Sequence, residues 1–257
     1  MLKNQYQLKI ISNERLTKNL YHLVLAGGHM AKKVKSGQFV HLRTTDGGKP
    51  FFRRPFSIFR AKKAIEILYD VVGQGTKILS KKSKGSFVDC IGPLGASFCM
   101  PPKGIKKVVM IAGGVGVAPF LALSDSLKNK KYEMILLYGG RNKDYVFNLK
   151  EFKKNGCRVY ISTDDGSVGM KGRVSNLFPK VKGKSDETFI YTCGPKLMMK
   201  AVQSFAEKQN ILGQASLEEV MACGIGTCLG CATKTKSGYK TVCKDGPVFN
   251  IEEIVFD

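Results

Sequence analysis

Two patterns of hydrophobic and polar residues divide the chain. Between residues 5 and 100, short runs rich in β-branched and aromatic residues alternate with turns that contain Gly, Lys and Asp. Runs of this length at this spacing are typical of an antiparallel barrel or sandwich. We expect its strands at residues 7–11, 21–25, 38–42, 57–60 and 64–71, and a short helix at 77–80.

The pattern changes to an alternation of strands and helices from residue 104 onward. A continuous apolar run at 107–112 is followed by a glycine-rich turn and a helical segment at 120–128. Such alternation predicts a doubly wound parallel sheet covered by helices. Further strands are expected at 133–138, 158–162 and 188–192, and the last helix at 196–208.

The chain after residue 212 combines a cysteine-rich loop, a hairpin and an apolar tail. The hairpin is expected at 232–235 and 239–242. The tail at 247–256 either packs against its own domain or forms a subunit contact. The sequence therefore predicts three domains: a β-barrel at 1–102, an α/β domain at 103–212 and a small C-terminal domain at 213–257.

Composition argues against a membrane or secreted protein. The longest nearly apolar run, 108–123, is interrupted by glycines and a proline and is too short to span a bilayer. The N-terminal residues have no apolar segment of the secretory type. Four cysteines lie scattered without the spacing of a disulfide framework, which favours the reducing cytoplasm. These are Cys90, Cys99, Cys157 and Cys193.

The formal net charge of +22 raises the question of nucleic-acid binding. However, the lysines are spread over the whole chain, and no recognition helix, RNA-binding signature or aromatic-interleaved basic patch accompanies them. The charge therefore indicates a lysine-rich solvated surface that attracts anionic dinucleotides or an acidic partner.

The most specific motif is a run of cysteines near the C-terminus. Cys223, Cys228 and Cys231 have the spacing C-x4-C-x2-C, and Cys243 follows at the end of the expected hairpin. Three thiolates from a tight loop and one from a later segment are typical of a plant-type [2Fe–2S] cluster. Interleaved glycines allow the backbone conformations that such a loop needs. Zinc remains the alternative, although only Cys228 and Cys231 form the C-x2-C pair of zinc sites.

Two segments of the expected barrel carry candidate phosphate-binding chemistry. An Arg with a nearby Ser could clamp a phosphate, and amides at a helix N-terminus suit a pyrophosphate. Alone, the first segment could be the beginning of a strand and the second a turn. The residues are Arg54, Pro55, Phe56 and Ser57 in the first segment and Gly73, Gly75 and Thr76 in the second.

The glycine-rich turn after the strand at 107–112 resembles a dinucleotide phosphate cradle. A strand, a glycine-rich turn and a helix in succession form this cradle in nucleotide-binding sheets. Gly113, Gly114 and Gly116 supply the glycines, whereas Pro119 departs from the usual pattern at its last position. Proline is tolerated in the first turn of a helix, so the cradle survives the change.

Ligands of such sheets bind beyond the carboxyl ends of the strands. Asp164 and Asp165 follow one strand, where they would accept hydrogen bonds from a ribose 2′-hydroxyl and repel a 2′-phosphate. This arrangement favours NAD over NADP, although Asp-Asp-Gly is also a common turn. The segment Cys193, Gly194 and Pro195 follows another strand.

Taken together, these motifs resemble the ferredoxin–NADP reductase superfamily, in which a flavin-binding β-barrel precedes a nicotinamide-binding α/β domain. The resemblance implies that the segment 54–57 lines FAD and that Gly73, Gly75 and Thr76 hold its phosphates. It also implies that Cys193-Gly194-Pro195 lies near the nicotinamide. A strand that passes FAD would contribute Leu68, Tyr69 and Asp70, the last of which departs from a more usual basic residue.

The segments 217–231 and 242–249 resemble, more narrowly, the electron-transfer subunits of NAD-dependent dihydroorotate dehydrogenases. The resemblance implies a relay in pyrimidine biosynthesis, in which NAD(H) exchanges a hydride with FAD and single electrons pass through the [2Fe–2S] cluster. The partner would be an FMN-containing catalytic subunit that oxidises dihydroorotate to orotate, in a heterotetramer of two subunits of each kind. This chain then needs no general base for the pyrimidine substrate.

Three other functions remain open. A flavin and iron–sulfur subunit of an NADPH-dependent or electron-bifurcating ferredoxin oxidoreductase would share all three domains but prefer a different nucleotide. A stand-alone diaphorase would act without a partner. A non-enzymatic basic zinc module would bind nucleic acid or protein, would contain no flavin, and would leave the cradle at 113–119 unexplained.

Overall fold

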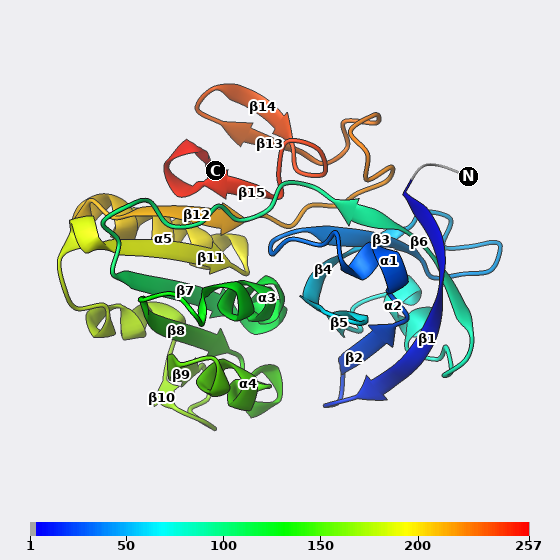
Figure 1. The fold of residues 1–257 in the computed structure, drawn as a ribbon, viewed down its shortest axis with the longest axis horizontal. Coiled ribbons are helices and arrows are strands. Elements are labelled where there is room, and N and C mark those ends of the chain that lie inside the picture. Colours follow the sequence, from blue (N-terminus) through cyan, green and yellow to red (C-terminus); the bar gives the residue numbers. More distant parts are fainter. Residues whose placement is uncertain (1–3, 257) are drawn as a thin grey trace.

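The structure, a computed structural model, describes residues 4–256, so the outermost residues of the first and third predicted domains lie outside it. Figure 1 shows a β-barrel, drawn in blue and cyan, beside a sheet flanked by helices. The C-terminal segment, drawn in orange and red, lies along the side of the molecule where the barrel and the sheet meet. The predicted combination of an antiparallel barrel, a parallel sheet and a small C-terminal unit is confirmed.

The barrel is closed, with its strands in the order β1-β2-β5-β4-β3-β6 and all neighbours antiparallel. The five predicted strands are present with altered ends, and the predicted helix begins earlier, at Gln74. The prediction missed β6, whose apolar pattern is interrupted by Asp89, Gly92 and Pro93. The elements are β1 (Gln5–Arg15), β2 (Leu20–Leu25), α1 (Gly28–Ala31), β3 (Phe39–Arg43), β4 (Arg54–Ala61), β5 (Ile65–Asp70), α2 (Gln74–Leu79) and β6 (Phe87–Leu94).

The second sheet has seven strands in the order β10-β9-β8-β7-β11-β12-β15. All neighbours are parallel except β15, which runs antiparallel to β12. The strands are β7 (Lys107–Gly113), β8 (Glu133–Gly140), β9 (Cys157–Thr163), β10 (Met170–Lys171), β11 (Thr188–Cys193), β12 (Leu212–Ser216) and β15 (Val248–Asn250). The helices are α3 (Ala118–Leu127), α4 (Leu149–Lys154) and α5 (Lys196–Gln209), with 3-10 turns η1 (Gly114–Val117), η2 (Lys143–Tyr145), η3 (Val174–Lys180), η4 (Ser185–Glu187) and η5 (Ile251–Glu253).

The C-terminal segment forms part of the core of this sheet. The predicted hairpin is present as β13 (Ala232–Thr235) and β14 (Gly238–Thr241). Neither β12 nor β15 was predicted, and β12 contains the expected domain boundary at 212/213. Of the two alternatives for the apolar tail, the structure has packing within the chain, because Phe249, Ile251 and Ile254 are buried in the same hydrophobic cluster as Ile111 of β7.

Hydrophobic clusters also join the barrel to the sheet. Phe59 and Leu68 of the barrel belong to the same buried cluster as Met110 of β7 and Phe120 of α3.

None of the helices in residues 4–256 is long and apolar enough to cross a membrane.

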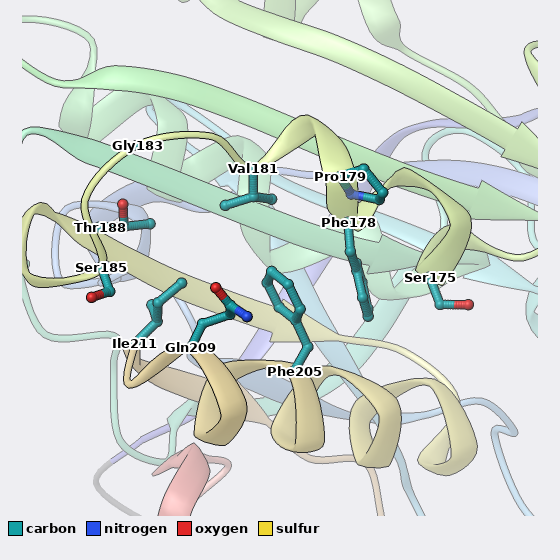
Figure 2. Close-up of a pocket in the computed structure, with 10 residues that line it drawn as sticks. All are labelled: Ser175, Phe178, Pro179, Val181, Gly183, Ser185, Thr188, Phe205, Gln209 and Ile211. Atoms are coloured by element: carbon teal, nitrogen blue, oxygen red, sulfur yellow. The ribbon is translucent and has the colours of Figure 1, made fainter.

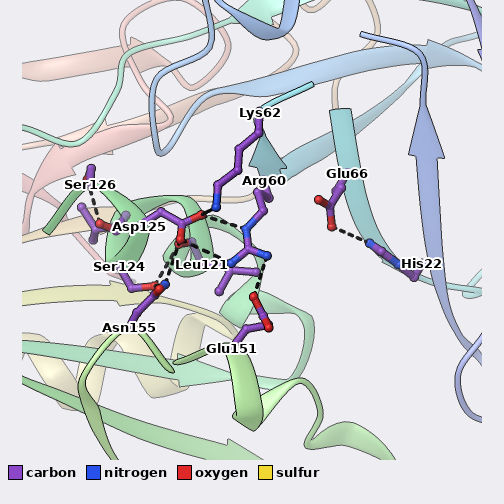
Figure 3. A network of polar contacts seen from close by, with 11 residues as sticks. His22, Arg60, Lys62, Glu66, Leu121, Ser124, Asp125, Ser126, Glu151 and Asn155 are labelled. Carbon is purple, nitrogen blue, oxygen red and sulfur yellow. Dashed lines mark hydrogen bonds and ion pairs between the residues drawn. The ribbon is translucent and has the colours of Figure 1, made fainter. Parts of the chain in front are cut away.

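An ion-pair network fastens the barrel to the helices of the sheet (Figure 3). The guanidinium of Arg60 on β4 donates from Nε to Asp125 Oδ2 of α3 and from Nη1 to Glu151 Oε2 of α4, each at 2.8 Å. Asn155 Nδ2 donates to Asp125 Oδ1 at 3.0 Å and to Ser124 Oγ at 2.9 Å. The Arg60 and Asp125 side chains are each only 13% exposed. We call these residues the Arg60 clasp.

Replacing Arg60 by Ala should destabilise the folded chain by about 2–4 kcal/mol, because it leaves a mostly buried carboxylate without its closest counter-ion. Chemical denaturation would measure the loss. As a control, Lys62→Ala should change stability by less than about 0.5 kcal/mol, since Lys62 is 57% exposed and its Nζ is 3.5 Å from Asp125. Equal effects of the two substitutions would contradict the role of the clasp.

The effect of Arg60→Ala on stability should depend on pH in the acid range. Burial raises the pKa of Asp125, but hydrogen bonds from Arg60 and Asn155 outweigh burial, so its pKa lies below the usual 3.8. The resulting stabilisation is complete above the usual pKa and is lost as pH falls through the lower, folded value. The stability difference between the native chain and Arg60→Ala should therefore shrink below about pH 3.8.

Candidate functional site

A cavity of about 810 Å³ lies where the barrel, the sheet and the C-terminal segment meet. Its size is that of a pocket for a large organic cofactor. Eight residues predicted from the barrel sequence line it, so segments that are separate in sequence form one wall. They are Arg54, Pro55, Phe56, Ser57, Leu68, Tyr69, Asp70 and Thr76.

Gly73 and Gly75 do not line the cavity and instead support its wall. A Cβ on Gly75 would lie 3.1 Å from Arg54 Nε, so glycine lets the first turn of α2 approach the guanidinium. The hydroxyl of Thr76 accepts hydrogen bonds from the amides of Val72 and Gly73 at 3.0 and 3.2 Å. These contacts hold the turn beside Arg54.

Aromatic rings form the apolar part of the wall. Tyr69 and Phe56 meet edge to face with ring centroids 5.7 Å apart. The Tyr69 hydroxyl donates to Asn13 Oδ1 at 3.0 Å, and burial raises its pKa far above the usual value. The phenol is therefore neutral and fixed, as suits a rigid surface against a planar ligand.

One buried oxygen atom in the cavity wall, Oδ1 of Asp70, has no hydrogen-bond partner. Burial raises the pKa of Asp70 above its usual value, although the amide of Val71 and the positive charge of Arg141 oppose this rise. Since buried polar groups are almost always paired, this oxygen suits a ligand that carries a hydroxyl donor. Oγ1 of Thr44, also unpaired, lies behind the wall beside Gly75 and Arg54.

The sheet and the C-terminal segment supply the opposite walls, which sequence reasoning missed. Val115 and Ala118 come from the glycine-rich turn and α3, and residues 217–222 follow β12. Glu218 faces the open cavity yet is surrounded by enough protein that burial raises its pKa. The segment 217–222 belongs to a recognised motif, but only the pairing of β12 with β11 brings it to the cavity.

The two glycine-containing loops predicted at the carboxyl ends of the strands contact each other. A Cβ on Gly116 would lie 2.4 Å from the carbonyl oxygen of Cys193, and one on Gly194 would lie 2.9 Å from the amide nitrogen of Gly113. Pro195 packs against Gly113, and Pro119 lies in the first turn of α3. Gly114 has a φ of +54° and open space around it.

Cys193 is fully enclosed at the end of β11. Burial raises the pKa of its thiol well above the usual value, and the negative charge of Glu218 raises it further. The thiol is therefore protonated and uncharged, it is no nucleophile, and it does not line the cavity.

Asp164 and Asp165 follow β9 at the same edge of the sheet, and both are exposed. The backbone amide of Asp164 donates to the carbonyl of Gly140 at 3.1 Å. The Asp165 carboxylate accepts from the amide of Ser167 at 2.9 Å, which lowers the pKa of Asp165. The two alternatives, a structural turn and a ribose site, are thus compatible, because the turn fixes the Asp165 carboxylate at the exposed edge of the sheet.

The four predicted cysteines come together in a separate site. Amides of the loop donate to their sulfur atoms: Ile225 and Cys228 to Cys223 Sγ, each at 3.5 Å, and Gly226 to Cys243 Sγ at 3.1 Å. The amide of Cys243 donates to Cys231 Sγ at 3.4 Å. Positive φ angles of 70° at Gly224 and 83° at Gly226 turn these amides inward.

The electrostatics of the sulfur atoms differ across this site. Burial raises the pKa of Cys223, but the amides of Ile225 and Cys228 outweigh it and lower this pKa to about 6. Burial and the neighbouring Cys231 raise the pKa of Cys243 to about 12. Amide donors to several sulfurs are the environment that iron–sulfur clusters use. In residues 4–256 no three His, Cys, Asp or Glu side chains are grouped as ligands of a single metal ion.

A second cavity of about 480 Å³ lies away from all predicted site residues. Figure 2 shows Phe178 of η3 and Phe205 of α5 side by side in its wall, and their ring centroids are 4.6 Å apart. It opens near the amino ends of β11 and β12, with Thr188 and Ile211 in its wall. Because ligands of parallel sheets bind at the carboxyl ends, the chemistry belongs to the first cavity.

Family models and relatives agree on the type of protein. Residues 110–204 match a model described as the oxidoreductase NAD-binding domain. Residues 218–255 match the iron–sulfur cluster binding domain of dihydroorotate dehydrogenase B. The chain is 40% identical to the dihydroorotate dehydrogenase B (NAD(+)) electron transfer subunit of Caldanaerobacter subterraneus subsp. tengcongensis, covering 96% of this chain and 97% of that one. The subunit of the same name from Desulforamulus reducens is 36% identical, with 98% of each chain covered.

Solved structures agree in fold. An NADH-dependent reduced ferredoxin–NADP oxidoreductase, studied for flavin-based electron bifurcation, superposes with a TM-score of 0.85 at 28% identity, covering 98% of this chain and 91% of that one. A ferredoxin–NADP+ reductase from Neisseria gonorrhoeae superposes with a TM-score of 0.71 at 18% identity, covering 80% and 92%.

Replacing Gly116 by Ala should destabilise the chain by about 2–3 kcal/mol, because the new methyl group would collide with backbone atoms that cannot rotate away. Thermal unfolding would measure this change. Gly47→Ala is the matched control, since nothing lies within 4 Å of its added Cβ. A native-like melting temperature for Gly116→Ala would contradict the close contact of the two loops.

Proposed function

The chain belongs to the family of dihydroorotate dehydrogenase B electron transfer subunits, and we propose that it passes electrons between NAD(H), FAD and a [2Fe–2S] cluster. The proposal rests on one observation. A single cavity has walls from the barrel, from the glycine-rich turn of the nucleotide-type sheet and from the segment that leads into the four-cysteine loop. A flavin in this cavity would thus lie between the nucleotide at the sheet and the cluster at the cysteine loop.

FAD is proposed to occupy the 810 Å³ cavity. Bound there, it would supply the conversion between two-electron hydride transfer and one-electron transfer. Arg54 lies beside the first turn of α2, where its charge would meet the phosphates. Tyr69 and Phe56 would pack along the flavin, and the unpaired oxygen of Asp70 would accept a hydrogen bond from a cofactor hydroxyl.

NAD(H) is proposed to bind across the carboxyl ends of β7, β9 and β11. Where the turn at Gly113–Gly116 meets the Cys193-Gly194-Pro195 segment, Gly114 has no side chain and open space around it, which suits close approach of a dinucleotide. The uncharged Cys193 thiol, enclosed beneath this surface, would lie near the nicotinamide ring without exposing area to it. The carboxylates of Asp164 and Asp165 would accept from the adenosine ribose and repel a 2′-phosphate.

Cys223, Cys228, Cys231 and Cys243 are proposed to hold the cluster. Inward-facing amides and two positive-φ glycines in the loop support this assignment. Cys231 and Cys243 are buried against the core of the sheet, whereas Cys228 is exposed. The proposed cluster therefore has an inner side toward the cavity-lining segment and an outer side through which electrons could leave.

An electron transfer subunit serves a catalytic partner. We propose that this partner carries FMN, oxidises dihydroorotate to orotate and forms a heterotetramer with two copies of this chain. The net charge of +22 favours a partner whose contact surface is acidic. The same proposal includes a cytoplasmic location, which is supported by eight free cysteines.

A flavin and iron–sulfur subunit of a bifurcating oxidoreductase is the second candidate. Its support is the superposition with the NADH-dependent reduced ferredoxin–NADP oxidoreductase over nearly the whole chain. Higher sequence identity to the dihydroorotate dehydrogenase subunits favours the first candidate. Ferredoxin reduction by NADH plus a second acceptor, in the absence of any dihydroorotate dehydrogenase subunit, would favour the second.

The direct test is an absorbance spectrum of anaerobically purified protein before and after NADH, with iron, sulfide and zinc measured on the same sample. We expect flavin and iron–sulfur bands that NADH bleaches, with about two iron and two sulfide per chain. Replacing Cys228 by Ser should abolish the iron–sulfur bands and leave NADH reduction of the flavin intact. A colourless native protein with one zinc would refute the relay, and loss of flavin reduction in a folded Cys228→Ser variant would refute the separation of the two sites.

Asp165→Asn tests nucleotide choice. The amide keeps an oxygen for the Ser167 amide but removes the charge that opposes a 2′-phosphate. We expect the preference of kcat/KM for NADH over NADPH to fall by about tenfold, equivalent to ~1.4 kcal/mol. Asp186→Asn, on a distant 3-10 turn, serves as the charge-matched control. An unchanged ratio in Asp165→Asn would remove this residue from the ribose site.

A further inference from the structure

One buried histidine separates the barrel wall of the cavity from the cysteine loop. His41 lies on β3, where its backbone pairs with Pro55 of β4 on one side and with Ile91 of β6 on the other. Its side chain is fully buried. Pro55 lines the large cavity, so His41 is one strand away from the proposed flavin site.

The other face of the His41 ring contacts the loop directly. A Cβ placed on Gly224 would lie 2.4 Å from His41 Nδ1 and 3.0 Å from Cε1. Gly224 follows Cys223, is itself buried and has a φ of +70°. The ring therefore fills space that only a glycine in this conformation leaves open.

The polar surroundings of the ring are unusual. Neither ring nitrogen makes a hydrogen bond of normal geometry, although backbone groups of Cys223 and Arg53 lie close enough to affect its charge. The charged side chains that face it are Arg53 and Arg54. Burial and Arg53 lower its pKa to about 4, so the ring is a neutral group.

The strand side of the ring is firmly anchored. Arg53 donates through Nη1 and Nη2 to the two carboxylate oxygens of Asp89 on β6, at 2.9 and 2.8 Å. Gln5 Nε2 of β1 donates to the same carboxylate at 3.0 Å. These hydrogen bonds join β1, β6 and the residue that precedes β4 behind His41. The backbone behind the ring is therefore held in place, so the ring can fix the position of the loop that it contacts.

We propose that His41 is a positioning residue that sets the separation of the cysteine loop from the flavin-binding strand by wedging its ring against Gly224. The inference rests on the proposed function, since it concerns transfer between two groups of that relay. Loss of the wedge would let Cys223 shift toward the barrel. The step from flavin to cluster would then change, while hydride transfer from NADH, on the other side of the cavity, would not.

The experiment is anaerobic stopped-flow reduction of the cofactor-loaded chain by NADH, followed separately in the flavin and iron–sulfur bands. For His41→Ala we expect native flavin reduction and faster cluster reduction, because the loop moves toward the flavin-binding strand and electron transfer between two groups speeds up as their separation falls. The electron paramagnetic resonance spectrum of the reduced cluster should also change. His22→Ala is the control, because His22 pairs with Glu66 at 3.0 Å elsewhere in the barrel and should leave all three signals native.

A second pair of variants keeps the test decisive if His41→Ala folds poorly. Gly224→Ala should disturb the cluster spectrum because its methyl group meets the ring, and adding His41→Ala should restore part of the native spectrum by opening space. Native cluster kinetics and spectrum in His41→Ala, or no rescue in the double variant, would overturn the inference while leaving the relay intact. A native chain that binds no flavin or no cluster would instead refute the proposed function itself.

Discussion

The Arg60 clasp is the constraint on which the geometry of the molecule depends. Barrel and sheet are separate hydrogen-bonded systems, and backbone contacts between them are few, such as the hydrogen bond from the Ala96 amide to the Gly246 carbonyl, so side chains do most to fix their separation. The guanidinium of Arg60 reaches two helices that cover the same face of the sheet, and the neighbouring apolar cluster excludes water around it. Because a bidentate, largely buried ion pair tolerates little displacement, the width of the cavity beside it is defined even though no strand crosses the junction.

The C-terminal segment adds a second constraint of a different kind. Through β12 and β15 it belongs to the sheet, and through residues 217–222 it closes the cavity. Cys231 and Cys243 share a buried cluster with Val109 and Ile190 of the sheet. The cysteine loop therefore packs on the nucleotide-type sheet through Cys231 and Cys243 and contacts the barrel through Gly224 and His41.

Local chemistry made part of this site predictable. Arg54-Pro55-Phe56-Ser57, the turn at Gly113 and the cysteine spacing each depend on neighbours in sequence, so their residues could be named without a fold. What escaped prediction depends on distant pairing. β6 is held by β1 and β3 despite an interrupted pattern, and Glu218 reaches the cavity only because β12 pairs with β11. Gly75 was singled out by its motif, yet it packs behind the wall that it was expected to form.

Because three parts of the chain line the cavity, a bound molecule affects how the whole chain unfolds. A molecule that fills the cavity touches residues from Phe39 to Thr76, from Val115 to Ala118 and from Leu217 to Pro247. Its binding free energy is then added to the stability of all three parts at once, in proportion to the logarithm of its concentration. The loaded chain should melt as one cooperative unit, whereas the empty chain lacks this contribution and depends at the same junction on the clasp, the apolar contacts and the packing of the C-terminal segment.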